Sequence, residues 1–257
     1  MVKTNREELI GVEEMAEVLT SFKASLRTAT WDELGQNARG TDRIALVIVD
    51  MVNGFCRQGV LASSRIAALI PTIVRLASEY RGTGAQYLLF VNDAHTEGAA
   101  EFGAFPPHCL AGTSESEVVD ELKPYLQGSF VFGKNATTAV FGARGRRYPD
   151  GEELDFLAFV RNLLAGDRVN LFVVAGNCTD LCVLQCALAL KLLGNSLNLP
   201  VKVVVPEDAV TTYDLPADTA QPAGALPHPA EPNHLWALYH MALNGISVVK
   251  SLVDNQV

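Results

Sequence analysis

The chain has 257 residues, of which 49% are hydrophobic and 19% are charged, and its formal net charge is −9. This length and apolar content suit one large domain with a full hydrophobic core. The acidic balance and the lack of a basic block argue against nucleic acid and membrane surfaces as partners, and no apolar run is long enough to span a membrane.

The cysteines indicate a protein that works with reduced thiols. They are Cys56, Cys109, Cys178, Cys182 and Cys186. Their odd number and clustering do not fit a disulfide framework, and residues 1–8 contain no signal-peptide core, so we expect a cytoplasmic protein. The regular spacing of the last three leaves open a three-thiolate metal site. This is the less favoured interpretation, because Cys186 fits better as a small buried helix residue.

Residues 1–40 are predicted to form a helical N-terminal arm. Apolar side chains recur at helical spacing between residues 8 and 34, and glycines between 35 and 42 indicate a linker. We expect an amphipathic helix that packs on the main domain, residues 41–257, or on another subunit of a homo-oligomer.

Strand-like and helix-like segments alternate through the rest of the chain. The strand-like runs are 44–49, 86–91, 129–132, 170–174, 201–205 and 246–249. The helical patterns are 64–80, 115–126, 153–164, 180–193 and 233–244, the second of which opens with a capping-box signal. Short strands that are apolar throughout are typical of strands covered on both faces. The sequence therefore predicts an α/β fold, a parallel six-stranded sheet with helices on both faces.

One segment interrupts this alternation. Residues 214–232 contain five prolines and no hydrophobic periodicity. They are predicted to form a long loop, and loops of this length are often lids or interface elements.

Three chemically active side chains each follow a predicted strand. Asp50 ends the first run, Lys134 follows the third, and Cys182 follows the fourth at the start of a helical pattern. Because parallel strands end at one edge of a sheet, where open α/β sheets bind ligands, these side chains are expected to converge. Together they would make a cysteine nucleophile, and the helix N-terminus would favour its thiolate form. Taken singly, each has an ordinary structural explanation.

A second polar group lies in the loop after the second predicted strand. Its members are Asp93, His95, Glu101 and His108. Carboxylate and imidazole suit Zn²⁺, Fe²⁺ or Mn²⁺, and side chains two residues apart in an extended chain can point the same way. The sequence therefore predicts a divalent metal ion, zinc by preference, with a polar surface loop as the alternative.

Several motifs resemble those of the isochorismatase-like cysteine hydrolases, and within them the nicotinamidases and pyrazinamidases. They are the segments 50–61, 93–113, 132–141 and 176–183, and the resemblance covers about residues 43–253. The loop that begins at Asp93 is the specific part, because many relatives in the superfamily lack it.

The resemblance implies a role for each site residue. Asp50 would be the general base, Cys182 the nucleophile, and Lys134 the cation that stabilises the resulting charges. A cis peptide between Asn177 and Cys178 would place the backbone N–H groups of Cys178 and Cys182 as an oxyanion hole. The four polar residues of the loop would hold the metal.

The implied activity is hydrolysis of nicotinamide to nicotinate and ammonia through a thioester. The metal would bind the pyridine nitrogen, and Phe55 and Phe105 would sandwich the ring. Departures from the usual nicotinamidase pattern at Val52, Leu181 and Phe105 leave another small carboxamide open as the substrate. A non-catalytic binding protein is the alternative from another functional class.

Overall fold

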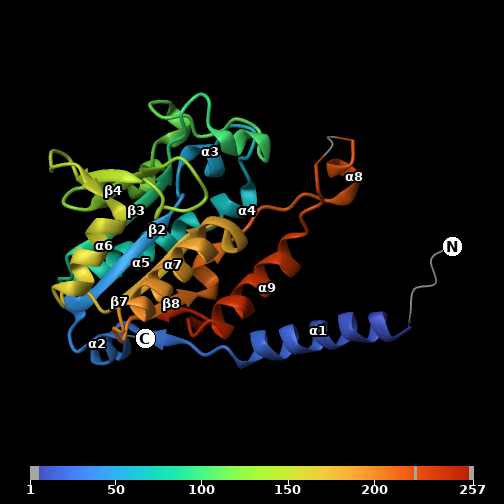
Figure 1. Ribbon diagram of the computed structural model, residues 1–257, viewed down its shortest axis with the longest axis horizontal. Coiled ribbons are helices and arrows are strands. Elements are labelled where there is room, and N and C mark those ends of the chain that lie inside the picture. Colours follow the sequence, from blue (N-terminus) through green and yellow to red (C-terminus); the bar gives the residue numbers. More distant parts are fainter. Residues whose placement is uncertain (1–5, 223–224, 255–257) are drawn as a thin grey trace.

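The computed structural model describes residues 6–222 and 225–254, and it contains the predicted parallel sheet (Figure 1). Six strands pair in parallel in the spatial order β10-β8-β7-β2-β3-β4. They are β2 (Ile44–Val49), β3 (Tyr87–Asp93), β4 (Phe130–Lys134), β7 (Leu171–Asn177), β8 (Lys202–Pro206) and β10 (Ser247–Val249). Each corresponds to one predicted run, so the fold class is confirmed.

Helices cover both faces of this sheet, as predicted. One face carries α3 (Asn53–Cys56), α4 (Ser64–Ala67) and α5 (Ile70–Gly82), and the other carries α6 (Phe156–Ala165), α7 (Leu184–Ser196) and α9 (Ala230–Leu243). A hydrophobic cluster lies between the sheet and the helices on each face. The central strand β2 contributes to both clusters, because alternate side chains point to opposite faces: Leu46 and Ile48 belong to one cluster and Val47 to the other.

The sheet extends further than predicted. Two short strands, β5 (Arg144–Arg147) and β6 (Leu154–Asp155), add antiparallel beside β4, and β9 (Val210–Thr211) pairs with β7. The β5 segment is rich in arginine and largely exposed, so it carries no hydrophobic signal. Its Gly145 is required by packing, because a Cβ there would lie 2.1 Å from the Val131 carbonyl oxygen.

The predicted helix over 115–126 is wrong. The segment forms two 3₁₀ turns, η3 (Ser114–Ser116) and η4 (Asp120–Tyr125), and the first has no side-chain cap. Between them Val118 pairs with Val52 in an antiparallel bridge, which takes its backbone away from a helical ladder. Pro124 lies inside the second turn and lacks the N–H that a longer helix would use. The remaining 3₁₀ turns are η1 (Thr41–Arg43), η2 (Ala100–Gly103) and η6 (Glu207–Ala209).

The N-terminal region forms two helices instead of one. Helix α1 (Arg6–Ser25) projects from the rest of the chain in Figure 1 and touches α9 through Phe22 and Tyr239, whose ring centroids lie 5.4 Å apart. Helix α2 (Trp31–Ala38) instead buries Trp31 in the main core. The domain boundary at residue 40 remains a prediction.

Short segments near the two ends of the chain meet beside α2. Strand β1 (Ala29–Thr30) pairs in parallel with β11 (Leu252–Val253).

In the part of the chain that the structure describes, no helix is both long and apolar enough to cross a membrane.

In its described residues, the proline-rich segment 214–232 contains the short helix α8 (Ala217–Ala220) and the first residues of α9, which begins at Ala230. An antiparallel bridge between Leu215 and His228 closes its base. The backbone N–H of each of these residues donates to the carbonyl of the other, at 2.9 and 2.8 Å. The segment is therefore a loop with a fixed base.

Candidate active site

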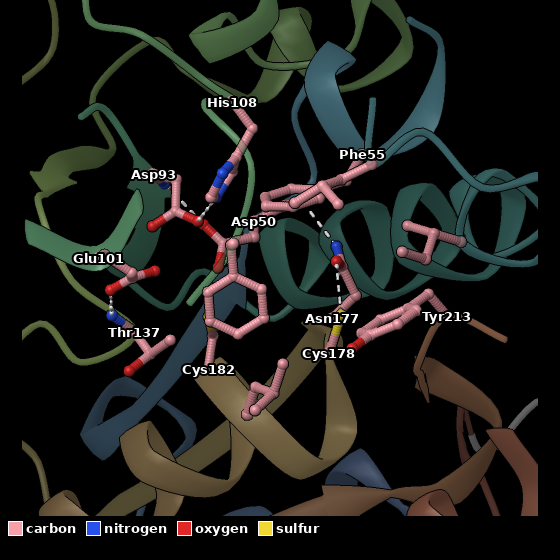
Figure 2. A pocket seen from close by; sticks show the side chains of 14 residues that line it. Asp50, Phe55, Asp93, Glu101, His108, Thr137, Asn177, Cys178, Cys182 and Tyr213 are labelled. Atoms are coloured by element: carbon pink, nitrogen blue, oxygen red, sulfur yellow. Dashed lines mark hydrogen bonds and ion pairs between the residues drawn. The ribbon is translucent and has the colours of Figure 1, made fainter. Parts of the chain in front are cut away.

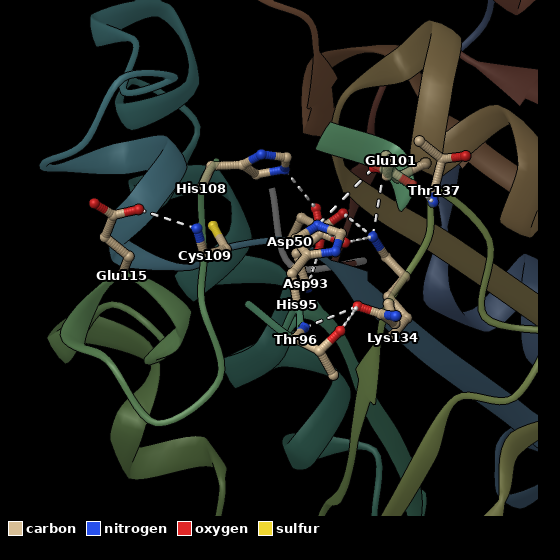
Figure 3. Close-up of polar contacts among 12 residues, drawn as sticks. Asp50, Asp93, His95, Thr96, Glu101, His108, Cys109, Glu115, Lys134 and Thr137 are labelled. Carbon is tan, nitrogen blue, oxygen red and sulfur yellow. Dashed lines mark hydrogen bonds and ion pairs between the residues drawn. The ribbon is translucent and has the colours of Figure 1, made fainter. Parts of the chain in front are cut away.

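The structure brings the three predicted strand-end residues together (Figures 2 and 3). Asp50 follows β2, Lys134 ends β4, and Cys182 lies in the turn after β7. The Lys134 Nζ atom is 2.9 Å from Asp50 Oδ2 and 3.4 Å from Cys182 Sγ. All three side chains are buried. The ammonium thus contacts both the acid and the thiol. The three side chains converge, as their positions at strand ends predicted.

Backbone groups hold Asp50 in an unusual conformation. Its φ angle is +54°, a left-handed value that non-glycine residues adopt infrequently. Its N–H donates to the Val91 carbonyl at 3.0 Å, and its own carbonyl accepts from the side-chain Nδ2 of Asn177 at 2.6 Å. Its carboxylate Oδ1 accepts from the Asp93 N–H at 2.7 Å. These bonds turn the carboxylate away from the strand and towards the lysine.

Burial and charge set the protonation of the three groups. Burial raises the pKa of Asp50 to about 6, an effect to which the Asp93 carboxylate adds and which Lys134 opposes. Burial alone would lower the pKa of Lys134, but Asp50 and Asp93 raise it well above its usual value. Lys134 therefore keeps its positive charge.

The thiol behaves differently from the prediction. Burial raises the pKa of Cys182 well above its ordinary value, although Lys134 lowers it. The expectation of a thiolate is therefore wrong for the resting site, because desolvation by burial is the largest influence on this thiol and favours its neutral form. A base must remove the thiol proton during reaction.

The turn that carries Cys182 is anchored on both sides. It is a π-type turn, Thr179–Val183, between β7 and α7, and the peptide before it, between Asn177 and Cys178, is cis. The Thr179 hydroxyl lies 2.8 Å from Nδ1 of the buried His234 on α9. The turn is thus held by β7 on one side and by α9 on the other.

Three of the four predicted metal ligands converge beside this group (Figure 3). Ligand atoms of Asp93, His95 and His108 all lie within 4.8 Å of one another, and all three residues are buried. The Asp93 carboxylate lies 3.5 Å from His95 Nε2 and 3.6 Å from His108 Nε2. Glu101 lies outside this group but close to it, with Oε1 3.9 Å from His95 Nε2.

The hydrogen bonds of these histidines fit a divalent metal ion. His95 is fully buried and neither of its ring nitrogens has a hydrogen-bond partner, which is costly unless a ligand satisfies one of them. His108 Nδ1 lies 2.8 Å from the Pro106 carbonyl oxygen, so it donates there and leaves Nε2 free to bind a metal. Two imidazoles and one carboxylate form a donor set that suits zinc or iron.

The three-thiolate alternative finds no support. Among the described residues, the groups with metal-binding geometry are Asp93, His95 and His108 and the overlapping set Asp50, Asp93 and Cys182. Cys178 and Cys186 belong to neither, and burial raises the pKa of each to about 12. All five cysteines are free thiols.

A pocket of about 430 Å³, part of it open to solvent, lies over the nucleophile (Figure 2). The predicted ring contacts Phe55 and Phe105 both line it, and their ring centroids lie 5.5 and 6.3 Å from that of His108. Among the other wall residues, Leu61 and Thr137 lie within two of the motif segments, although no role in the pocket was predicted for them. The sequence did not point to Ile66 and Tyr213, which lie outside every motif.

Comparison with known proteins identifies the family. A model of the isochorismatase domain matches residues 44–225. The chain is 32% identical over 218 residues to Nicotinamidase 1 of Arabidopsis thaliana, covering 81% of this chain and 86% of that protein. It is also 32% identical over 155 residues to the nicotinamidase/pyrazinamidase of Mycobacterium tuberculosis, covering 56% of this chain and 76% of that one.

Solved structures share the fold. The pyrazinamidase/nicotinamidase of Streptococcus mutans superposes with a TM-score of 0.60 at 24% identity, covering 80% of this chain and 99% of that one. The pyrazinamidase of Pyrococcus horikoshii, solved in complex with zinc, gives a TM-score of 0.58 at 22% identity, covering 81% and 99%. The chain therefore belongs to the isochorismatase family, and it is an amidohydrolase of that family.

Proposed function

We propose that this protein hydrolyses nicotinamide to nicotinate and ammonia, using Cys182 as the nucleophile. The observation that carries the proposal is the position of Lys134, which contacts both the Asp50 carboxylate and the Cys182 thiol next to a buried set of metal-ligand side chains. A nucleophile and a site for the ring nitrogen thus border one pocket with apolar walls.

Asp50 acts as both base and acid in the proposed reaction. Its raised pKa lies close to neutral pH, where a group can take up and release a proton with little cost. It takes the proton of Cys182 as the sulfur attacks the carboxamide carbon. It then gives this proton to the amide nitrogen, which leaves as ammonia when the carbon–nitrogen bond breaks, and water hydrolyses the thioester that remains.

Lys134 and two backbone N–H groups stabilise the charges that develop. The ammonium faces the sulfur and partly compensates its charge once the proton has left. The N–H groups of Cys178 and Cys182 receive the oxyanion, and each such donor typically contributes about 3 kcal/mol to the transition state. The cis peptide before Cys178 belongs to this arrangement.

Asp93, His95 and His108, with Glu101 beside them, would hold a divalent cation, for which zinc is our first choice. When bound, the cation would supply a Lewis-acidic position for the pyridine nitrogen. Phe55 and Phe105 would enclose the ring, and Asp93 would also remain paired with Lys134. The metal group and the nucleophile are thereby joined through one carboxylate.

Another small carboxamide is the second candidate substrate. Leu181 and Phe105, which depart from the usual nicotinamidase pattern, both line the pocket, so they would contact the substrate directly. Hydrolysis of a different amide would use the same Asp50, Lys134 and Cys182.

Ammonia release from nicotinamide, pyrazinamide and benzamide tests the proposal. Nicotinamide and pyrazinamide should react, whereas benzamide, which lacks the ring nitrogen, should be strongly disfavoured, because a lost directed polar contact in a closed site is costly. A chelator should reduce turnover of the first two. Cys182→Ala should abolish hydrolysis, with Cys186→Ala as the matched control for a buried cysteine. Equal kcat/KM for benzamide and nicotinamide would rule out the metal-anchored ring, and inactivity on all three would favour another amide.

A further inference from the structure

A histidine at the base of the proline-rich loop lies against the active-site turn. His228 Nε2 is 2.6 Å from Asp180 Oδ2, and Asp180 belongs to the π-type turn that carries Cys182. The side chains of His228 and Asp180 are only 14% and 11% exposed, so this hydrogen-bonded contact is largely shielded from solvent. The loop is thereby connected directly to the turn that carries the nucleophile.

The same imidazole packs on a wall of the pocket. Its plane stacks on the ring of Tyr213, with centroids 3.9 Å apart and an interplanar angle of 13°. Its Nδ1 lies 2.9 Å from the Tyr213 carbonyl oxygen. Tyr213 lines the pocket beside Cys178, on the side opposite Glu101 in Figure 2. The ring of Tyr213 therefore has the pocket on one side and His228 on another.

The backbone around His228 gives this contact a fixed frame. The bridge between Leu215 and His228 closes the loop, and the Ala230 N–H donates to Asp214 Oδ1 at 2.8 Å. The imidazole thus has a rigid base, a carboxylate partner on one nitrogen and a carbonyl partner on the other.

We propose that His228 is a positioning residue for substrate selection: held by Asp180, it fixes Tyr213 as the wall that packs on the ring of the substrate. This inference rests on the proposed function, because it assumes that the pocket takes a flat ring amide. It assigns a role to loop 214–232, whose base sets the width of the pocket without contributing a reacting group. The residues that take part in bond making remain Asp50, Lys134 and Cys182.

Steady-state kinetics on nicotinamide test this inference. His228→Ala should raise KM about tenfold and leave kcat within about threefold. The substitution removes the support of Tyr213 in the pocket wall and leaves the position of Cys182 unchanged. His240→Ala is the matched control, since His240 also stacks on an aromatic ring, that of Trp236, but on α9 and away from the pocket lining. It should leave both constants unchanged.

Two further variants separate the contacts of His228. His228→Gln can place its amide where Nε2 bonded Asp180, whereas His228→Asn can replace only the Nδ1 contact to Tyr213. If Asp180 holds the imidazole, the glutamine variant should keep a KM closer to wild type than the asparagine variant. Tyr213→Ala should raise KM similarly, and the double variant with His228→Ala should be no worse than Tyr213→Ala alone, because the two residues act as one unit.

Ligand protection of Cys182 from alkylation measures binding without turnover, so it tests the role of His228 separately from the proposed reaction. Nicotinate should protect Cys182 from iodoacetamide, and the protecting concentration should rise about tenfold in His228→Ala while the unprotected rate stays the same. A wild-type KM and wild-type protection in His228→Ala would overturn the inference and leave the proposed function standing. A fall in kcat together with a changed unprotected rate would also overturn it, because His228 would then act through the nucleophile. If the wild type hydrolyses no nicotinamide, the proposed function fails, and equal protection in both proteins overturns the inference as well.

Discussion

Replacing Asp50 with asparagine tests the central pairing of the site. The side chain keeps its shape and one acceptor oxygen, which can still receive the Asp93 N–H. Its amide group would then face the Lys134 ammonium, which lies 2.9 Å from the carboxylate oxygen. Two donors would meet where a charge pair existed, and the variant could neither accept nor return a proton.

The expected size of the effect follows from these contacts. Loss of a positioned general acid–base group typically costs about 10²–10⁴-fold in rate, or about 3 to 5 kcal/mol of barrier. A buried donor left without an acceptor costs about 1–3 kcal/mol of folding stability. We therefore expect Asp50→Asn to remain folded. Its kcat for nicotinamide should fall at least about 100-fold, the lower end of the range for loss of a general acid–base group.

The rate of Cys182 alkylation separates two explanations for this loss. The Asp50 charge raises the pKa of the Cys182 thiol, and Lys134 lowers it. Removing the Asp50 charge therefore leaves Asp93 as the remaining carboxylate that opposes the effect of Lys134, and iodoacetamide should label Cys182 at least as fast as in the wild type. Hydrolysis should fall nevertheless, because no group can protonate the departing ammonia.

The assay pairs ammonia release with mass-spectrometric labelling, and urea unfolding confirms the fold. Asp120→Asn, at an exposed carboxylate distant from the site, is the control and should match the wild type in all three. A variant at position 50 that retained more than a tenth of wild-type kcat would refute the acid–base role. Labelling that slowed in step with hydrolysis would show that the loss lies in forming the thiolate.

Three other substitutions test the surroundings of the site. His108→Ala should lose the metal and raise KM for nicotinamide, and unchanged metal content by elemental analysis would contradict the ligand assignment. Lys134→Met leaves two buried carboxylates without their cation, so it should lower the free energy of unfolding, measured in urea, by about 3–5 kcal/mol. The control Lys123→Met removes a lysine from an exposed salt bridge and should not shift the urea midpoint. Gly176→Ala should prevent stable folding, because Gly176 has a φ angle of +120° and a Cβ there would lie 2.0 Å from the Val49 carbonyl oxygen; a soluble variant with a wild-type melting temperature would contradict this.

The parallel sheet could be read from the order of apolar runs. Six short runs, each followed by a helical pattern or a loop, leave little choice of architecture, because a strand that is apolar throughout must be covered on both faces. The same rule predicts that Asp50, Lys134 and Cys182 meet at one edge of the sheet, since parallel strands all end on the same side. The two helices of the N-terminal region and the 3₁₀ turns near residue 120 could not be read in this way. Local signals there compete with tertiary pairing, such as the bridge between Val52 and Val118.

Protonation and the pocket walls depended on packing. A helix N-terminus predicts a thiolate at Cys182, but its full burial reverses that preference, and burial is a property of the assembled core. Likewise, nothing in the pattern around Tyr213 or His228 links them to Asp180, which is 48 residues from His228 along the chain. Chemistry that depends on residue type and strand order is encoded locally. The shape and electrostatics of the pocket come from contacts between distant segments, and these exist only once the chain has folded.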